Sequence, residues 1–236
     1  MHRPEMASMD KVRVIVVGDS GVGKTSLVHL MSHGEPLVGS PPWTVGCSVE
    51  VKLHEFREGT PAQKSYFVEF WDIGGSSSHR NARNVFYNPT HGIILVHDLS
   101  NRKSHENLRK WLAEVLNRDS ASSSRSVATD QFDPEQFVGS TQIPILVIGT
   151  KSDLVEKLRT SRRSPSIAEE CGADEIVVDC HEGRSLAAGS SAAVKLARFF
   201  DKVIERKYQT REARDRAPPF VVDSRRSRPY KGYHND

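Results

Sequence analysis

Six apolar runs of strand length lie along the chain, and segments with helical periodicity separate most of them. The runs cover residues 12–18, 47–56, 65–71, 92–98, 143–149 and 175–179. In the second run apolar and polar residues alternate, and a turn-like segment joins it to the third. This pattern predicts an antiparallel hairpin whose first strand is a half-exposed edge strand.

The other runs are nearly continuous in hydrophobic residues and rich in Val and Ile, which is typical of central parallel strands. Helical periodicity is found at 24–33, at 104–118 and, most clearly, at 196–203. The alternation of strands and helices predicts the α/β class. We expect a three-layer fold with a six-stranded, mostly parallel sheet, helices on both faces and a ligand at the carboxyl ends of the strands.

A phosphate-binding pattern follows the first predicted strand. Residues 18–25 read Gly-Asp-Ser-Gly-Val-Gly-Lys-Thr, which is G-x-x-x-x-G-K-T between a strand and a helix. In such a loop the backbone N–H groups curl around a phosphate, and the helix N-terminus adds its positive dipole. Lys24 would reach the β- and γ-phosphates and the Thr25 hydroxyl a Mg²⁺ ion. The alternative, a glycine-rich turn that only connects two elements, rarely carries the whole pattern, so we expect a nucleoside phosphate as ligand.

The length of 236 residues suits one domain with appendages. We expect a flexible N-terminus at 1–10 and the domain at 11–208. A Ser-rich stretch at 119–142 is longer than an ordinary connection and predicts a disordered insert. Residues 209–236 lack a sustained period and predict a basic disordered tail.

The charge is concentrated at the C-terminal end. The formal net charge is +3, and residues 211–236 alone contain seven Lys or Arg and four Asp or Glu, a balance of 7 − 4 = +3. The rest of the chain is therefore neutral, which argues against nucleic acid as a partner of the domain. The tail either contacts an acidic partner or an anionic membrane weakly, or only keeps the chain soluble.

Cysteine usage and the chain ends bear on location. Cys47, Cys171 and Cys180 lack metal-ligand spacing and predict free thiols in a reducing compartment. No apolar run reaches the length of a membrane span, and residues 1–10 lack the apolar stretch of a secretory signal. The chain begins Met-His and ends without a cysteine, so no direct lipid anchor is expected. We expect a cytoplasmic protein that is peripheral at membranes only through partners or its tail.

Three further elements lie at or near the ends of other predicted strands. Asp72 precedes a pair of glycines, where its carboxylate would hold the Mg²⁺ water shell and the Gly75 N–H would face a γ-phosphate. Thr44 supplies a second hydroxyl for the metal and the γ-phosphate. Asp153, in a Thr-Lys-Ser-Asp stretch, can accept two hydrogen bonds from guanine, whereas adenine offers no such pair of donors. Each element alone is explained equally well by an ordinary turn.

Together, the order and spacing of these elements resemble the Ras-like small GTPases, most closely the Rab branch, over residues 11–207. The resemblance implies a P-loop GTPase fold and a guanine-nucleotide switch that binds GTP or GDP with Mg²⁺. It implies metal contacts by Thr25, Thr44 and Asp72. It implies catalytic roles for Lys24, Thr44, Gly75 and Ser76. The nucleotide contacts that it implies are Ser20, Gly21, Val22, Gly23, Lys24, Thr25, Ser26, Thr150, Lys151, Asp153, Asp179 and Cys180.

The chain departs from this family at four positions. Ser76 stands where the family has a water-orienting glutamine, so slow GTP hydrolysis is expected. Thr150 replaces an asparagine and Leu37 an aromatic residue, which predicts a looser nucleoside and faster exchange; about 1.4 kcal/mol is a tenfold loss of affinity. At Cys180 the family's base-contacting motif is not preserved, so this residue either offers its backbone N–H to guanine or is a buried core thiol.

Two loops, at 34–46 and 74–88, are the switch loops by position, and we expect effector or regulator proteins to bind there. Trp43 either belongs to such an interface or folds into the core. With the predicted edge strand at 47–56 it offers a surface for a partner or for a second copy of the chain in a homodimer.

Three functions stay open at this point. The first is a slow GTP-hydrolysing switch in signalling or vesicle traffic, and the second is a non-hydrolysing, GTP-bound scaffold or dimerisation module. A P-loop kinase or ATPase is disfavoured, because no arginine-rich lid segment follows the central strands and because Asp153 suits guanine.

Overall fold

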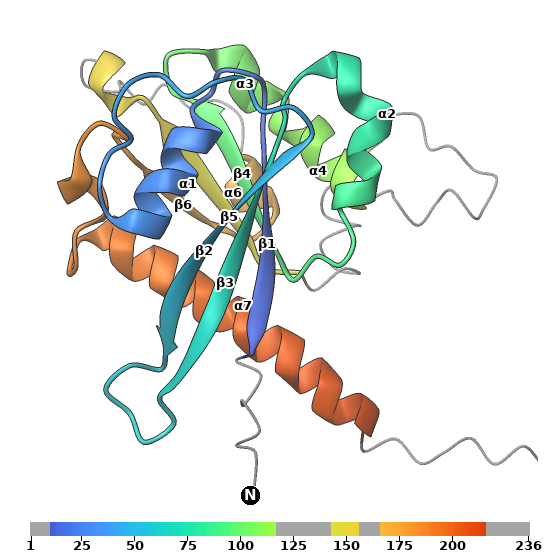
Figure 1. Ribbon diagram of the computed structural model, residues 1–236, viewed down its shortest axis with the longest axis vertical. Coiled ribbons are helices and arrows are strands. Elements are labelled where there is room, and N and C mark those ends of the chain that lie inside the picture. The colour runs from blue at the N-terminus through green and yellow to red at the C-terminus, as the bar shows by residue number, and fades with distance from the viewer. Residues whose placement is uncertain (1–9, 117–142, 156–165, 216–236) are drawn as a thin grey trace, which may run out of the picture.

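A six-stranded sheet forms the middle layer of the molecule, in the order β2-β3-β1-β4-β5-β6 (Figure 1). All neighbouring strands pair in parallel except β2 and β3, which form the antiparallel hairpin. The predicted α/β fold, the hairpin and the position of its first strand at the edge are therefore confirmed. The strands are β1 (Lys11–Val17), β2 (Cys47–Phe56), β3 (Lys64–Ile73), β4 (Gly92–Asp98), β5 (Ile145–Thr150) and β6 (Asp174–Val177).

The computed structural model describes residues 10–116, 143–155 and 166–215. The insert expected at 119–142, the N-terminal residues 1–9 and the chain beyond 215 lie outside the described residues. The principal helices are α1 (Lys24–His33), α2 (Arg80–Arg83), α3 (Arg102–Glu106), α4 (Leu108–Leu116), α6 (Ile167–Glu170) and α7 (Ser191–Asp215). Short 3₁₀ turns occupy Ser77–His79, Asn84–Phe86, Ser152–Leu154 and Gly183–Leu186.

Two hydrophobic cores lie on the two faces of the sheet, and β1 contributes to both. Val12, Val14 and Val16 point to the core beneath α1 and α7, whereas Ile15 and Val17 point to the core beneath α4 and α6. Because successive side chains of a strand face opposite sides, a strand covered on both faces must be apolar throughout. The continuous hydrophobic run of β1 thus follows from its central place in a three-layer fold.

Two predictions about single elements are wrong in detail. The helix expected at 104–118 is interrupted at Asn107, whose side-chain amide donates to the Asp19 carboxylate at 2.8 Å. The run at 175–179 was expected to be central but forms the second edge strand, β6, with Val177 46% exposed. The last helix, α7, continues to Asp215, and residues 209–215 contain no Gly or Pro to end it.

The loops that carry the sequence motifs gather at the carboxyl edge of the parallel strands, the upper end in Figure 1. Strand β1, which precedes the phosphate-binding loop, lies between β3 and β4. The connection from β1 to β2 runs toward one edge of the sheet, and the connection from β3 to β4 runs toward the other. Ligands of open α/β sheets bind at such a point. Among the described residues, no helix has the length and apolarity needed to cross a membrane.

Candidate functional site

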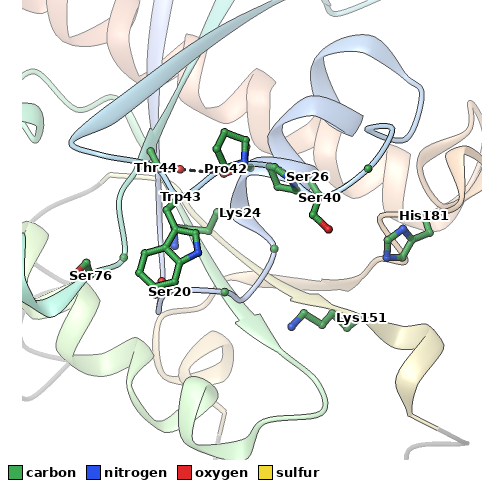
Figure 2. Close-up of a pocket in the computed structure, with 16 residues that line it drawn as sticks. Ser20, Lys24, Ser26, Ser40, Pro42, Trp43, Thr44, Ser76, Lys151 and His181 are labelled. Atoms are coloured by element: carbon green, nitrogen blue, oxygen red, sulfur yellow. Dashed lines mark hydrogen bonds between the residues drawn. The ribbon is translucent and has the colours of Figure 1, made fainter.

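A cavity of about 600 Å³ opens around the loop between β1 and α1. In Figure 2, Lys151 and His181 lie on the side of the opening away from Thr44 and Ser76, with Lys24 between them. The residues that line the cavity come from several loops: Ser20, Gly21, Gly23, Lys24, Thr25, Ser26, Gly39, Ser40, Pro41, Pro42, Trp43, Thr44, Gly75, Ser76, Lys151 and His181.

The loop at 18–25 wraps around the side chain of Lys24. Gly21 and Gly23 have φ of 78° and 91°, a left-handed conformation that lets the chain curl before α1 begins. The Lys24 Nζ donates to the carbonyl oxygens of Gly18 at 2.9 Å and Asp19 at 2.8 Å. Burial lowers the pKa of Lys24 to about 8, although nearby carboxylates favour its charged form. A buried cation is thus held by carbonyl groups at the bottom of the cavity.

Three oxygen-bearing side chains meet beside this lysine. The Thr25 hydroxyl donates to the Asp72 Oδ2 at 2.6 Å, and the Thr44 hydroxyl donates to the same oxygen at 3.2 Å. The two hydroxyl oxygens are 3.1 Å apart. Burial raises the pKa of Asp72, against the effect of the hydroxyl donors, and its Oδ1 is buried with no hydrogen-bond partner in the described part of the chain. Hydroxyl and carboxylate oxygens suit Mg²⁺, and the unpartnered carboxylate oxygen fits a ligand for such an ion.

The loop after β3 packs directly on the loop at 18–25. A Cβ atom at Gly75 would lie 2.5 Å from the Ser20 backbone nitrogen, so only glycine fits there. The Ser76 hydroxyl accepts a hydrogen bond from the Ser78 N–H at 3.3 Å. Gly75 and Ser76 therefore line the cavity directly beside the loop at 18–25.

Sequence reasoning missed a buried arginine behind this loop. Arg83 is 3% exposed, and its guanidinium donates to both Glu114 carboxylate oxygens at 3.0 Å and to the carbonyl oxygens of Gly74 and Ser76 at 3.3 and 2.9 Å. The Tyr87 hydroxyl donates to the same carboxylate at 2.7 Å. Arg83 thus anchors residues 74–76 to α4.

The same cluster reaches the phosphate-binding loop. The Arg83 guanidinium lies 4.3 Å from the ring centroid of Trp111, and the Trp111 indole N–H donates to the Asp19 Oδ1 at 2.8 Å. Two loops that line the cavity are therefore fastened to α4 through one group of side chains. In the sequence Arg83 belongs to a polar run that is typical of a surface loop, and no local signal marks it as buried.

On the opposite side of the cavity, the residues after β5 are held by their own network. The Lys151 Nζ forms an ion pair with the Asp98 Oδ2 at 2.7 Å. Asp153 is exposed, in the turn that follows. Thr150 is fully buried: its hydroxyl donates to the Val22 carbonyl at 2.5 Å, with the His97 carbonyl at 3.0 Å as a second acceptor. The Thr150 side chain therefore fastens the phosphate-binding loop to β5 and does not line the cavity.

The remaining predicted residues lie in the core or beside the cavity. The Val22 side chain is 2% exposed and belongs to the core. Asp179 accepts a hydrogen bond from the His181 N–H at 2.8 Å, and His181, which sequence reasoning did not single out, lines the cavity. The Cys180 side chain packs in the core, where burial raises the pKa of its thiol to about 12. The predicted residues that do not line the cavity are Val22, Asp72, Thr150, Asp153, Asp179 and Cys180.

An exposed apolar stripe extends from the cavity along β2. Trp43 is 87% exposed, so the alternative that it folds into the core is wrong. Val49, Val51 and Leu53 on β2 are 46%, 49% and 51% exposed. Their side chains lie on one face of an edge strand, where further backbone hydrogen bonds are available to a partner.

Comparison of the sequence with known proteins identifies a family and several relatives. The family profile of Roc, described as "Ras of Complex, Roc, domain of DAPkinase", matches residues 13–133. Rab-like protein 3 of Mus musculus is 54% identical over 214 residues, which cover 88% of this chain and 90% of the relative. Rab-like protein 3 of Danio rerio is 48% identical over 238 residues, covering 98% of this chain and 100% of the relative.

A more distant relative shares part of the chain. Small GTPase LIP1 of Arabidopsis thaliana is 39% identical over 172 residues, which cover 67% of this chain and 46% of the relative. The high identity to the vertebrate proteins extends over nearly their whole length, and the profile match includes both the phosphate-binding loop and the loop after β3. The chain therefore belongs to the Ras-like small GTPases, in the group formed by the Rab-like protein 3 relatives.

Proposed function

We propose that this protein is a guanine-nucleotide switch that binds GTP and GDP with Mg²⁺ and hydrolyses GTP slowly. The observation that carries the proposal is the convergence of Lys24, Thr25, Thr44 and Lys151 on one cavity of about 600 Å³ at the carboxyl edge of the sheet. Lys24 would bind the β- and γ-phosphates, and Thr25, Thr44 and Asp72 would hold the metal directly or through water. When bound, Mg²⁺ supplies neutralisation of the phosphate charge.

The base would lie toward Lys151 and Asp153. A carboxylate that accepts from the guanine N1–H and the exocyclic amine selects guanine over adenine, and the Lys151 stem covers the ring. Lys151 is held in position by its ion pair with Asp98. The backbone N–H groups of Asp179 and Cys180 would contribute, since the neighbouring His181 lines the same cavity, whereas the His181 N–H already donates to the Asp179 carboxylate.

Asp153→Asn tests the choice of base. We expect GDP affinity to fall by about 10- to 100-fold. The carboxylate accepts two charge-assisted hydrogen bonds from guanine, whereas the asparagine amide keeps one neutral acceptor and turns its NH₂ group toward a second N–H donor of the base. Xanthosine diphosphate, which carries a carbonyl where guanine has its amine, should bind the variant more tightly than it binds the parent protein. The measurement is calorimetry with both nucleotides, together with chromatographic identification of the nucleotide that co-purifies.

The matched control is Asp174→Asn, which removes one carboxylate from β6, where it pairs with Lys202 at 3.9 Å. It should leave GDP affinity unchanged. Purified protein that contains no nucleotide and gives no heat with GDP or GTP would reject the proposal, as would displacement of bound GTP by excess ATP.

Hydrolysis is proposed to be slow because Ser76 is too short to orient a water molecule. Its hydroxyl is engaged with the Ser78 N–H at 3.3 Å. Replacing it, Ser76→Gln, should raise single-turnover phosphate release at least about tenfold, since positioning of the attacking water limits the rate. Ser77→Gln, one position further along the same loop, is the control and should have no effect. Equal rates for all three proteins would contradict a role for position 76.

A second candidate function is a non-hydrolysing, GTP-bound scaffold or dimerisation module. The exposed stripe of Trp43 and β2, together with Ser76 in the cavity, favours it. Under either function, effectors, regulators or a second copy of the chain would bind at the switch loops 34–46 and 74–88. Light scattering with GDP and with a non-hydrolysable GTP analogue separates the two: partner or self-association that depends on the γ-phosphate indicates a switch, whereas equal association in both states indicates a static module.

A further inference from the structure

A buried histidine lies on β4 without a hydrogen bond to its side chain. His97 is 3% exposed, and neither Nδ1 nor Nε2 has a hydrogen-bond partner among the described residues. An unsatisfied polar group inside a protein is costly, and each such group requires a physical reason such as ligation of an ion. The proposed nucleotide site does not use this side chain.

Two further ligand-type side chains meet His97 from other elements. The Glu175 Oε1 on β6 lies 3.7 Å from the His97 Nε2, and the ring centroid of His105 on α3 lies 4.8 Å from that of His97. One potential ligand atom of each of the three residues lies within 4.8 Å of the others. Ligands at about 2.0–2.1 Å from a tetrahedral ion would be about 3.3 Å apart, so side-chain adjustments of up to about 1.5 Å close the site.

Strand β5, which lies between β4 and β6, leaves room for His97 and Glu175 to face each other. Gly149 on β5 is the register partner of His97, and a Cβ atom at Gly149 would lie 3.2 Å from the His97 Cε1. Glu175 pairs with Val147 two residues earlier on β5. Because residues two apart on a strand share a face, His97 and Glu175 point to the same side of the sheet across β5. A larger residue at 149 would press on the imidazole.

We propose that His97, His105 and Glu175 bind one zinc ion, with water in the fourth position. Two imidazoles and one carboxylate are a ligand set that Zn²⁺ accepts, and a hard cation such as Mg²⁺ or Ca²⁺ would require oxygen ligands. The His105 and Glu175 side chains are only partly buried and give the ion a route from solvent, while His97 closes the site from inside. Zinc would join α3, β4 and β6 next to Asp98, the partner of Lys151.

A second group, His29, His33 and Glu50, also has ligand-type side chains close together. It is more open to solvent, with the His33 side chain 57% exposed, and its histidines face Glu50 at 3.8 and 3.3 Å. Any zinc bound there would obscure the test. All titrations are therefore made in the 236-residue chain that carries His29→Ala and His33→Ala.

The experiment is calorimetric titration of this chelator-treated background with zinc chloride. We expect one ion per chain with a dissociation constant in the micromolar range or below, and a Tm that rises by roughly 5 °C at saturating zinc. His105→Ala and Glu175→Gln, both at partly exposed positions, should each weaken binding at least tenfold, and the two together should abolish it. Cobalt should give the visible absorption of a four-coordinate site in the background and lose it in the paired variant.

His79→Ala and Glu106→Gln are the matched controls, because they remove the same groups from exposed positions outside the cluster. They should bind zinc as the background does. A background that binds no zinc overturns the proposal. So does binding that survives in both His105→Ala and Glu175→Gln, since the ion would then be held elsewhere. Neither result bears on guanine-nucleotide binding, which is measured separately.

Discussion

Lys24→Ala is expected to weaken GDP and GTP binding by about 100-fold. The variant removes the only side-chain cation that the described loop at 18–25 offers to the phosphates, and hydrogen bonds to charged groups contribute about 1.5–3 kcal/mol each. Calorimetry with each nucleotide measures the loss. Lys103→Ala, which removes an exposed lysine from α3, is the control and should bind as the parent does.

The lowered pKa of Lys24 also predicts how nucleotide affinity depends on pH. Burial holds this pKa at about 8 in the free protein, so the ammonium is charged below pH 8 and becomes neutral as the pH rises through that value. Phosphates favour the charged form and raise the pKa in the complex, so that binding takes up a proton above pH 8. Nucleotide affinity should therefore fall up to tenfold per pH unit above about 8. A slope that persists in Lys24→Ala would contradict this assignment.

Glu114→Ala is expected to lower the free energy of unfolding by about 3–5 kcal/mol. Arg83 and Glu114 have side chains only 4% and 11% exposed, and removal of the carboxylate leaves a buried guanidinium without its counter-charge. The Tyr87 hydroxyl loses its acceptor as well. Urea unfolding followed by circular dichroism, in the same buffer for all variants, measures the change.

Glu106→Ala is the matched control for this prediction, because it also breaks a pair of arginine and glutamate on the same side of the sheet. The side chains of Arg102 and Glu106 are 91% and 56% exposed, so the loss should stay within about 0.5 kcal/mol. The double variant Arg83→Met with Glu114→Met should recover much of the lost stability, since apolar residues can replace a buried ion pair. A loss below about 1 kcal/mol in Glu114→Ala would contradict the buried-pair explanation.

The parts of the fold that follow from local pattern could be predicted from the sequence. A strand covered on both faces has to be apolar throughout, so β1 was recognisable, and the alternation in β2 revealed an edge strand. The phosphate-binding loop was equally recognisable because its chemistry lies within eight consecutive residues. The order of the strands is a property of the whole chain, and for that reason β6 was expected in the centre although it lies at the edge.

The parts of the candidate site that depend on distant contacts could not be predicted. Thr150 was expected to be a weakened contact to the base, but its hydroxyl bonds to the Val22 carbonyl in the interior. Arg83 resembled a surface residue, yet it connects residues 74–76 with α4. In both cases the role is set by a partner far away in the sequence, and no spacing rule covers such a pair.

The length of the last helix, α7, sets where residue 215 lies relative to the cavity. A helix of 25 residues is about 37 Å long, and in Figure 1 its C-terminal end projects past the sheet at the end opposite the cavity. An affinity handle or fluorophore attached after residue 215 would therefore leave the cavity facing solution. Surface immobilisation through that point should allow nucleotide and partner binding to be followed on the same oriented molecules.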